Sequence, residues 1–315
     1  MIGESANKPN RRRPWVAATL SLVMPGLGHT YSGRLPRGLV FLLVHFVPIM
    51  MLQAGRVFEV FGSVIAGVVA LLTLAPLIHI AAIIDSYYVA RCTTHDYEMK
   101  DYNRWYVYVA LVLLNSASSL NATLSLRANY LEAFRVPTVS NYPTIAPNDR
   151  FLANKIAYIN ADPKRGDLVV FTNPQDRKVN FIKRAVAIGG DTVEIKDGML
   201  YINDRQVARR RVEESETDGM GMGLNGQPVK GEVLFEVNGD MQYKIFLAAP
   251  PHEQYSGDFG KITVPRHHCF VLGDNRNLSQ DSRHFGPVPL ATIKGRAEYL
   301  YWPAKGWSRF GSLKN

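Results

Sequence analysis

Three long apolar stretches without a charged side chain lie in the first 126 residues, and they constrain the fold more than any other feature. Residues 38–55, 60–84 and 105–126 contain no Lys, Arg, Asp or Glu. A helix needs about 20 mainly apolar residues to cross a bilayer, and the second and third stretches meet that length. Core helices of a soluble protein are the alternative, but three such stretches in succession favour transmembrane helices. The sequence therefore predicts a membrane anchor region over residues 1–126.

An earlier apolar stretch, residues 15–33, is interrupted by turn-forming residues. Pro25, Gly26 and Gly28 follow its first apolar positions and break a continuing helix. We therefore expect a half-helix or a re-entrant element here. A cleavable signal peptide is a poor alternative, because no small-residue cleavage pattern ends the apolar run.

Basic residues indicate the orientation of the helices, because cytoplasmic loops are enriched in Lys and Arg. Three basic clusters flank the apolar stretches, namely Arg11 to Arg13, Arg34 with Arg37, and Arg91 with Lys100 and Arg104. If residues 15–33 also crossed, the second and third clusters would lie outside the cell. If they do not cross, all three clusters are cytoplasmic and the chain after Leu126 is external. The charges favour three crossings and an extracytoplasmic second half.

The second half, residues 127–315, has the pattern of a mainly-β domain. Short β-branched runs alternate with Gly, Pro, Asn and Asp, as in DLVVFTN and NFIKRAVAI. The whole chain has a net charge of +9, but no Walker loop, helix-turn-helix or RNA-binding motif accompanies it. Nucleic acid is therefore not an expected partner. Two cysteines exclude a disulfide scaffold and a four-cysteine zinc site.

Ser140 and Lys183 are the first two candidates for chemistry. Ser140 lies between Pro137 and Pro143, which disfavour a helix and indicate a turn that presents the hydroxyl. Lys183 shares one face of a predicted strand with Phe181, and burial on an apolar face lowers the pKa of a lysine towards that of a general base. Taken separately, an ordinary turn serine and an ordinary surface lysine fit these patterns as well.

A polar loop, Gly273 to Gly286, follows the apolar run HCFVL. Its two Asp, two Arg and two Ser residues are suited to a buried ion-pair network that supports a neighbouring site. A calcium loop is the alternative, but the EF-hand spacing is absent and the arginines oppose a cation. No metal is therefore expected.

Four segments together resemble the type I signal peptidases. They are PTVSNYPT from Pro137 to Thr144, RGDLVVF from Arg165 to Phe171, KRAVAIGGD from Lys183 to Asp191, and GDNRNLSQDSR from Gly273 to Arg283. They occur in the order of that family, over roughly residues 134–303. The resemblance implies a signal-peptidase-like β-fold with a smaller inserted β subdomain, near residues 197–265, after the helical transmembrane region.

The same resemblance implies roles for individual residues. Ser140 would be the nucleophile and Lys183 the general base, without a cofactor. The Ser140 N–H and the Thr138 hydroxyl would form the oxyanion hole. Ser279 would orient the lysine amine. The expected supporting residues are Arg184, Asp274, Asp281 and Arg283, and the expected substrate-pocket residues are Phe134, Val136, Asn141, Ile145 and Phe181.

The function implied is that of a membrane-bound serine endopeptidase that removes signal peptides after small residues, in an Ala-x-Ala pattern. The resemblance places it in a bacterial inner membrane, with signal peptides and lipids as partners, acting as a monomer. The apolar stretches predict a multi-pass protein, which departs from the one or two anchors common in the family. Asn141 departs from the family, which has methionine there, and Val139 replaces a glycine. A specialised processing peptidase with few substrates and a catalytically silent binding paralogue are the alternatives.

Overall fold

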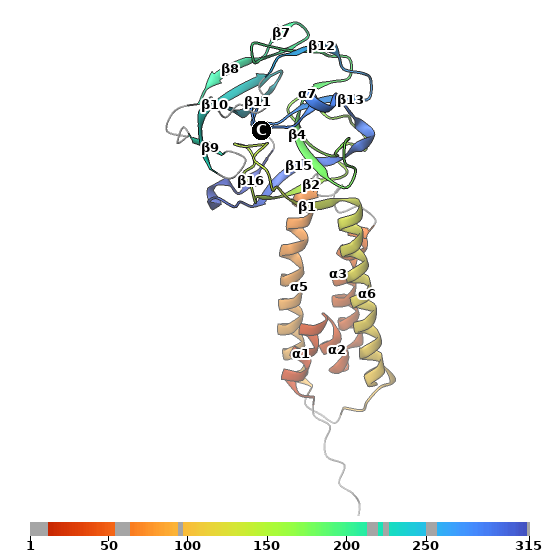
Figure 1. The fold of residues 1–315 in the computed structure, drawn as a ribbon. Helices are drawn as coiled ribbons and strands as arrows, with labels where there is room; N and C mark the ends of the chain where they lie inside the picture. The colour runs from red at the N-terminus through yellow and green to blue at the C-terminus, as the bar shows by residue number, and fades with distance from the viewer. Residues whose placement is uncertain are drawn as a thin grey trace, which may run out of the picture. The chain divides into compact units, whose positions relative to one another are not determined.

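The computed structural model describes residues 12–53, 64–93, 97–212, 220–222, 227–249 and 257–313. The chain divides into two compact units, Met1–Asn129 and Tyr130–Asn315. The first unit is helical and the second consists mainly of strands (Figure 1). This composition confirms the predicted fold class of an α-helical region followed by a mainly-β domain.

Two helices in the described part of the first unit are long and apolar enough to cross a membrane, over Ala66–Cys92 and Trp105–Asn129. A third, shorter helix, over Leu35–Gln53, contacts both of them. The helices of this unit are α1 (Pro14–Val23), α2 (Leu27–Tyr31), α3 (Leu35–Gln53), α5 (Val64–Cys92) and α6 (Trp105–Asn129), with a 3-10 turn η1 (Asp101–Asn103).

The helix expected over residues 60–84 continues to Cys92, past the charge at Asp85. Asp85 accepts hydrogen bonds from Arg37 Nε at 2.7 Å and Nη2 at 2.5 Å, and its Oδ2 lies 2.7 Å from His29 Nε2. A carboxylate paired in this way can lie within an apolar helix. The helix therefore continues beyond the transmembrane stretch predicted over about residues 60–84, whereas residues 54–63 lie outside the described part.

The stretch over residues 15–33 forms two short helices, α1 and α2, separated at Met24 to Gly26. Gly26 has a φ of +98°, and a Cβ there would meet the Gly38 carbonyl oxygen of α3 at 2.4 Å. A Cβ at Gly28 would meet the Ala17 carbonyl oxygen at 2.1 Å. The glycines that break the apolar stretch therefore also allow its two short helices to pack closely on their neighbours.

The second unit is built on an eight-stranded antiparallel sheet. Its order is β1 (Leu131–Arg135), β2 (Arg150–Asn154), β15 (Ile293–Trp302), β3 (Leu168–Thr172), β4 (Asn180–Ile188), β13 (His268–Leu272) and β14 (Val288–Pro289), with β16 (Gly311–Ser312) paired to β15. Short helical turns complete this part of the chain, namely α7 (Ser282–Phe285), η3 (Leu290–Thr292) and η4 (Trp307–Arg309).

Two smaller sheets lie between β4 and β13 in the sequence. One contains β12 (Phe259–Thr263), β5 (Thr192–Lys196), β6 (Met199–Ile202) and β7 (Arg205–Gln206). The other contains β11 (Met241–Ala248), β10 (Pro228–Asn238), β8 (Ala208–Arg211) and β9 (Met220–Met222). The strands of these sheets begin at Thr192, a few residues before the start proposed for the inserted subdomain.

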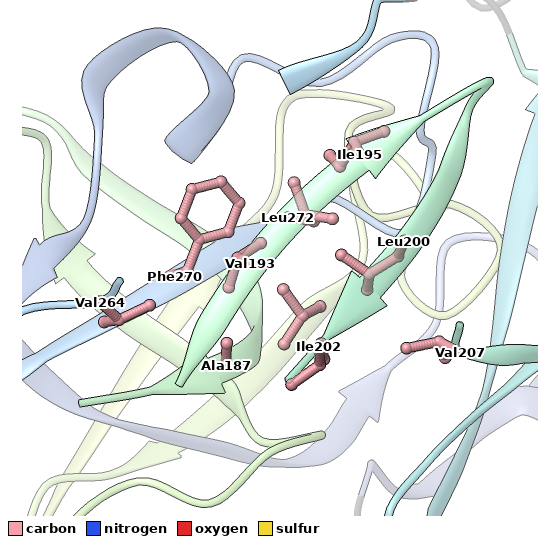
Figure 2. Packing of buried hydrophobic residues seen from close by; sticks show 10 residues of the cluster. Ala187, Val193, Ile195, Leu200, Ile202, Val207, Val264, Phe270 and Leu272 are labelled. Atoms are coloured by element: carbon pink, nitrogen blue, oxygen red, sulfur yellow. The ribbon is translucent and has the colours of Figure 1, made fainter. Parts of the chain in front are cut away.

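A hydrophobic cluster joins the large sheet to the first small sheet (Figure 2). Phe270 and Leu272 of β13 pack there with Val193 of β5 and Leu200 of β6, and all four side chains are buried. Burying a side chain of this size stabilises the fold by about 1.5–3 kcal/mol. The cluster fixes β13, which leads directly into the polar loop that begins at Gly273.

Candidate active site

Ser140 lies in a compact turn after β1. The Tyr142 N–H donates to the Val139 carbonyl at 3.0 Å, and the Ile145 N–H donates to the Asn141 carbonyl at 2.9 Å. The Asn275 N–H, from the polar loop, donates to the Ser140 carbonyl at 3.1 Å. The backbone of the turn is therefore held by its own bonds and by the loop that follows β13. We call residues Val139 to Thr144 the nucleophile turn.

Lys183 lies in the middle of β4 and reaches the hydroxyl of Ser140. Its Nζ donates a hydrogen bond of 2.7 Å to Ser140 Oγ. The lysine side chain is buried, 4% exposed, and its Nζ is 5.3 Å from the centre of the Phe181 ring. The tertiary fold thus brings a turn residue and a strand residue together, although they lie 43 positions apart in the chain.

Burial lowers the pKa of Lys183 to about 8, because the charged ammonium loses its hydration. The carboxylates of Asp281 and Asp274 raise this pKa in part, and Arg283 lowers it. A substantial share of the lysine is therefore neutral near pH 8. A neutral amine at hydrogen-bond distance from a hydroxyl can accept its proton.

Thr138 supplies a second hydroxyl beside the first. Its Oγ1 lies 3.2 Å from Ser140 Oγ, and the side chain lines the same groove. A hydroxyl in that place can donate to an oxyanion that forms when Ser140 attacks a carbonyl.

Arg184, the residue after Lys183 in β4, forms a buried ion pair with Asp274. Arg184 Nε and Nη2 donate to the two Asp274 oxygens, each at 2.7 Å, and Arg184 Nη1 donates to the Gly166 carbonyl at 2.7 Å. Thr144 Oγ1 donates to Asp274 Oδ2 at 2.5 Å. Thr144, which the sequence analysis did not single out, thus connects the nucleophile turn to this pair.

Asp281 and Arg283 form the second ion pair expected from the polar loop. Arg283 donates to Asp281 from Nε at 2.8 Å and from Nη2 at 2.9 Å, and the Gly273 N–H donates to Asp281 at 3.0 Å. Burial by itself raises the pKa of Asp281, but the bonds from Arg283 outweigh that effect and hold the pKa below its usual value. Asp281 is therefore ionised at neutral pH.

Ser279 does not make the contact that the sequence analysis expects, which is a hydrogen bond to the Lys183 amine. Its side chain is fully buried, and its Oγ has no hydrogen-bond partner among the residues that the structure describes, so the expected bond to the Lys183 amine is not formed. A Cβ at Gly273 would lie 2.1 Å from this Oγ. Ser279 packs against the glycine that begins the loop, and orientation of the lysine by Ser279 is not seen.

A groove of about 260 Å³ opens over the Ser140 and Lys183 side chains. Phe134, Val136 and Phe181 line it, as the sequence analysis expects. The lining residues that the sequence analysis did not name as pocket residues include Phe151, Val170, Val179, Asn180, Ile182, Leu278 and Gln280. They come from strand positions and loop ends that only the tertiary fold brings together.

Asn141 and Ile145 do not line this groove, although both are expected pocket residues. Each is fully buried. Ile145 packs in a hydrophobic cluster with Phe151 and Leu168, beneath the groove. Asn141 turns its amide towards β4. The short turn carries both side chains inward, which the sequence alone does not show.

No group of three or more His, Cys, Asp or Glu side chains that could hold a metal ion occurs in the described ranges of the chain. The site contains a serine hydroxyl beside a buried lysine amine, a neighbouring threonine hydroxyl and an open groove. This is the arrangement that a serine hydrolase with a lysine base requires.

Comparison with known proteins gives the family. Residues 104–302 match the family described as signal peptidase, peptidase S26. Since this match covers more than half of the chain, the chain belongs to that family and is a serine peptidase. The helical region, residues 16–129, also matches a family of unknown function (DUF6677).

Individual relatives agree with the family. A probable signal peptidase I-2 of Synechocystis sp. is 34% identical over 186 residues, which are 57% of this chain and 67% of the relative. The thylakoidal processing peptidase 1 of Arabidopsis thaliana is 30% identical over 196 residues, 59% of this chain, but the match spans only 46% of that protein. A crystal structure of a signal peptidase I from Enterococcus faecalis is 26% identical over 42% of this chain and 95% of that chain, with a TM-score of 0.28.

Proposed function

We propose that this protein is a membrane-bound signal peptidase that cleaves N-terminal signal peptides from exported preproteins after small residues, in an Ala-x-Ala pattern. The observation that carries the proposal is the hydrogen bond of 2.7 Å between the buried Lys183 Nζ and Ser140 Oγ. It lies at the groove of a chain that belongs to the signal peptidase family.

The chemistry starts with neutral Lys183. Its Nζ accepts the Ser140 hydroxyl proton while Oγ forms a bond to the carbonyl carbon of the scissile peptide. The carbonyl oxygen becomes an oxyanion, which the Ser140 N–H and the Thr138 hydroxyl stabilise. The tetrahedral intermediate then collapses, the C–N bond breaks, and the Lys183 ammonium gives its proton to the leaving amine. The product is an ester between Ser140 and the signal peptide.

Water completes the cycle. Lys183, neutral again, accepts a proton from a water molecule as its oxygen attacks the ester carbonyl. When the second tetrahedral intermediate collapses, the proton passes from Lys183 to Ser140 Oγ. The signal peptide leaves with a new carboxylate, and both side chains return to their starting states.

Substrate selection follows from the walls of the groove. The Phe134 and Phe151 rings stack with their centres 5.6 Å apart, and both line the groove. Two aromatic rings in contact occupy space that larger substrate side chains would need. This packing supports a preference for small residues, and it also supports the alternative of a specialised peptidase with few substrates.

We further propose that the second unit acts outside the cytoplasm, beside the membrane lipids. The basic clusters on the flanks of the apolar helices support this orientation. The long apolar helix α6 ends at Asn129 and β1 begins at Leu131, so the chain leaves a hydrophobic helix directly before the peptidase fold.

The test is turnover of a preprotein with an Ala-x-Ala cleavage site by the full chain in detergent. Ser140→Ala and Lys183→Ala should each lower kcat by at least about 1,000-fold, because they remove the nucleophile or its base. Matched controls are Ser308→Ala and Lys196→Ala at exposed positions of the same unit. Wild-type turnover in either active-site variant would exclude this mechanism, and a peptide library would distinguish general from narrow specificity.

A further inference from the structure

Asn141 follows the proposed nucleophile in the sequence and is fully buried. Its side-chain Nδ2 donates a hydrogen bond of 2.7 Å to the backbone carbonyl of Ile182, the residue directly before Lys183. Its Oδ1 is also buried and has no hydrogen-bond partner in the part of the chain that the structure describes. The side chain is therefore bound through its donor, and Asn141 is not among the residues that line the groove.

The carbonyl that Asn141 binds belongs to the free part of a strand. β13 pairs with β4 from Arg184 to Ile188, and this pairing ends where Leu272 meets Arg184. Residues 180–183 extend beyond it and line the groove. Without another contact, this end of β4 would be fixed on one side only, by β3. The Asn141 amide supplies a bond that joins it to the nucleophile turn.

These contacts form a closed ring. Ser140 and Asn141 are neighbours in the turn, and Ile182 and Lys183 are neighbours in the strand. One hydrogen bond joins Asn141 Nδ2 to the Ile182 carbonyl, and another joins Lys183 Nζ to Ser140 Oγ, each at 2.7 Å. We propose that Asn141 is a positioning residue, which holds the nucleophile turn against β4 so that Ser140 and Lys183 stay in contact.

This inference rests on the proposed function, since it assigns a role in the same site. It also changes the role that the sequence suggests for Asn141. A pocket residue touches substrate and alters its binding, whereas a positioning residue alters the rate of the bound complex. The two roles therefore predict different kinetic effects.

Asn238, the last residue of β10, provides a matched control because it binds the same strand, β4. It is buried, 3% exposed, and its Nδ2 donates to the Val186 carbonyl of β4 at 2.8 Å. Asn238→Leu removes the same kind of bond from β4 but leaves the nucleophile turn untouched. Asn141→Leu removes the bond within the ring. Both variants are compared with the wild-type full chain by preprotein cleavage and by Tm.

We expect Asn141→Leu to lower kcat about 10- to 100-fold with KM changed less than twofold. Asn238→Leu should lower Tm by about as much as Asn141→Leu does, while kcat of the folded Asn238→Leu enzyme stays within twofold of the wild-type value. An unchanged kcat with altered KM or altered residue preference in Asn141→Leu would overturn the proposal. Equal loss of kcat in both variants would show a merely structural role.

A second measurement needs no substrate. Asn141→Asp keeps the size of the side chain, removes the donor and places a carboxylate near Lys183, whose other charged neighbours are Asp274, Asp281 and Arg283. NMR titration of protein labelled at its lysine side chains should show Lys183 titrating at higher pH in Asn141→Asp and unchanged in Asn238→Asp. If Lys183 titrated at the same pH in Asn141→Asp and Asn238→Asp, that result would contradict the proposed ring of contacts. Failure of the wild type to cleave any preprotein would instead contradict the proposed function.

Discussion

Asp274 lies opposite Arg184 in a pair from which water is excluded, and both of its oxygens accept hydrogen bonds from the guanidinium. Arg184 is the largest of the fully buried side chains among the described residues. The pair also binds Thr144 of the nucleophile turn, so it connects the polar loop, β4 and the turn. Its removal should affect the fold and the site together.

Asp274→Ala should lower the free energy of unfolding by about 3–5 kcal/mol, because it leaves a buried guanidinium without its counter-ion. Urea denaturation of the full chain in detergent measures this change. Asp204→Ala is the control, since Asp204 forms its ion pair with Lys261 at the surface and should leave the stability nearly unchanged. Equal effects of the two substitutions would contradict the role given to the buried pair.

The proposed mechanism predicts that activity rises with pH. Lys183 must be neutral to accept a proton, and its pKa is about 8, so kcat/KM should increase as pH rises through 8 and then level off. Asp281→Asn removes a negative charge that raises this pKa, so the rise should move to lower pH. Initial rates from pH 6 to pH 10 test both statements. A profile that is flat over this range would exclude Lys183 as the base.

Lys183 should also destabilise the fold at neutral pH. Its pKa is lowered from 10.5 to about 8, so the unfolded chain binds more protons than the folded one between these values, and stability rises with pH over that window. Below pH 8 the buried charge costs about 3 kcal/mol. Lys183→Met should therefore be more stable than wild type at pH 6, with a difference that shrinks towards pH 10.5. Denaturant midpoints at both pH values measure this, and a constant difference would contradict it.

Thr138 should contribute to catalysis through its side-chain hydroxyl. Thr138→Val keeps the shape of the side chain but removes the donor proposed for the oxyanion, so kcat should fall about 100- to 1,000-fold. Thr138→Ser retains the hydroxyl and should stay within about tenfold of wild type. Single-turnover cleavage measures the attack on the peptide bond separately from product release. Equal rates for the valine and serine variants would show that the hydroxyl takes no part.

The orientation of the membrane region has its own test. A reporter enzyme fused after Leu126 should behave as an extracytoplasmic protein, because the charges favour three crossings with the amino terminus inside. A reporter fused after Arg37 should behave as cytoplasmic. A cytoplasmic signal from the first fusion would reject three crossings and move the peptidase unit to the other side of the membrane.

The sequence predicts the fold class because the two units differ sharply in composition. It also selects Ser140 and Lys183, which lie within ordered motifs of a known family. It ends the helix at residue 84, because the partners of Asp85 lie on other helices. It cannot show that Thr144 binds Asp274 or that Asn141 faces β4, because both contacts depend on how the nucleophile turn folds. The missing bond of Ser279 depends on backbone placement for the same reason.

The nucleophile turn has one further support, from the chain after β15. Arg309 donates from Nη2 to the Thr144 carbonyl at 3.1 Å and from Nη1 to Asp149, the residue whose carboxylate binds the Ala146 N–H. Residues 166 positions apart, Pro143 and Arg309, thus meet at the turn. During synthesis, the ribosome makes Ser140 and Lys183 long before it makes Arg309. The nucleophile turn therefore gains these contacts only after nearly all of the second unit has been made.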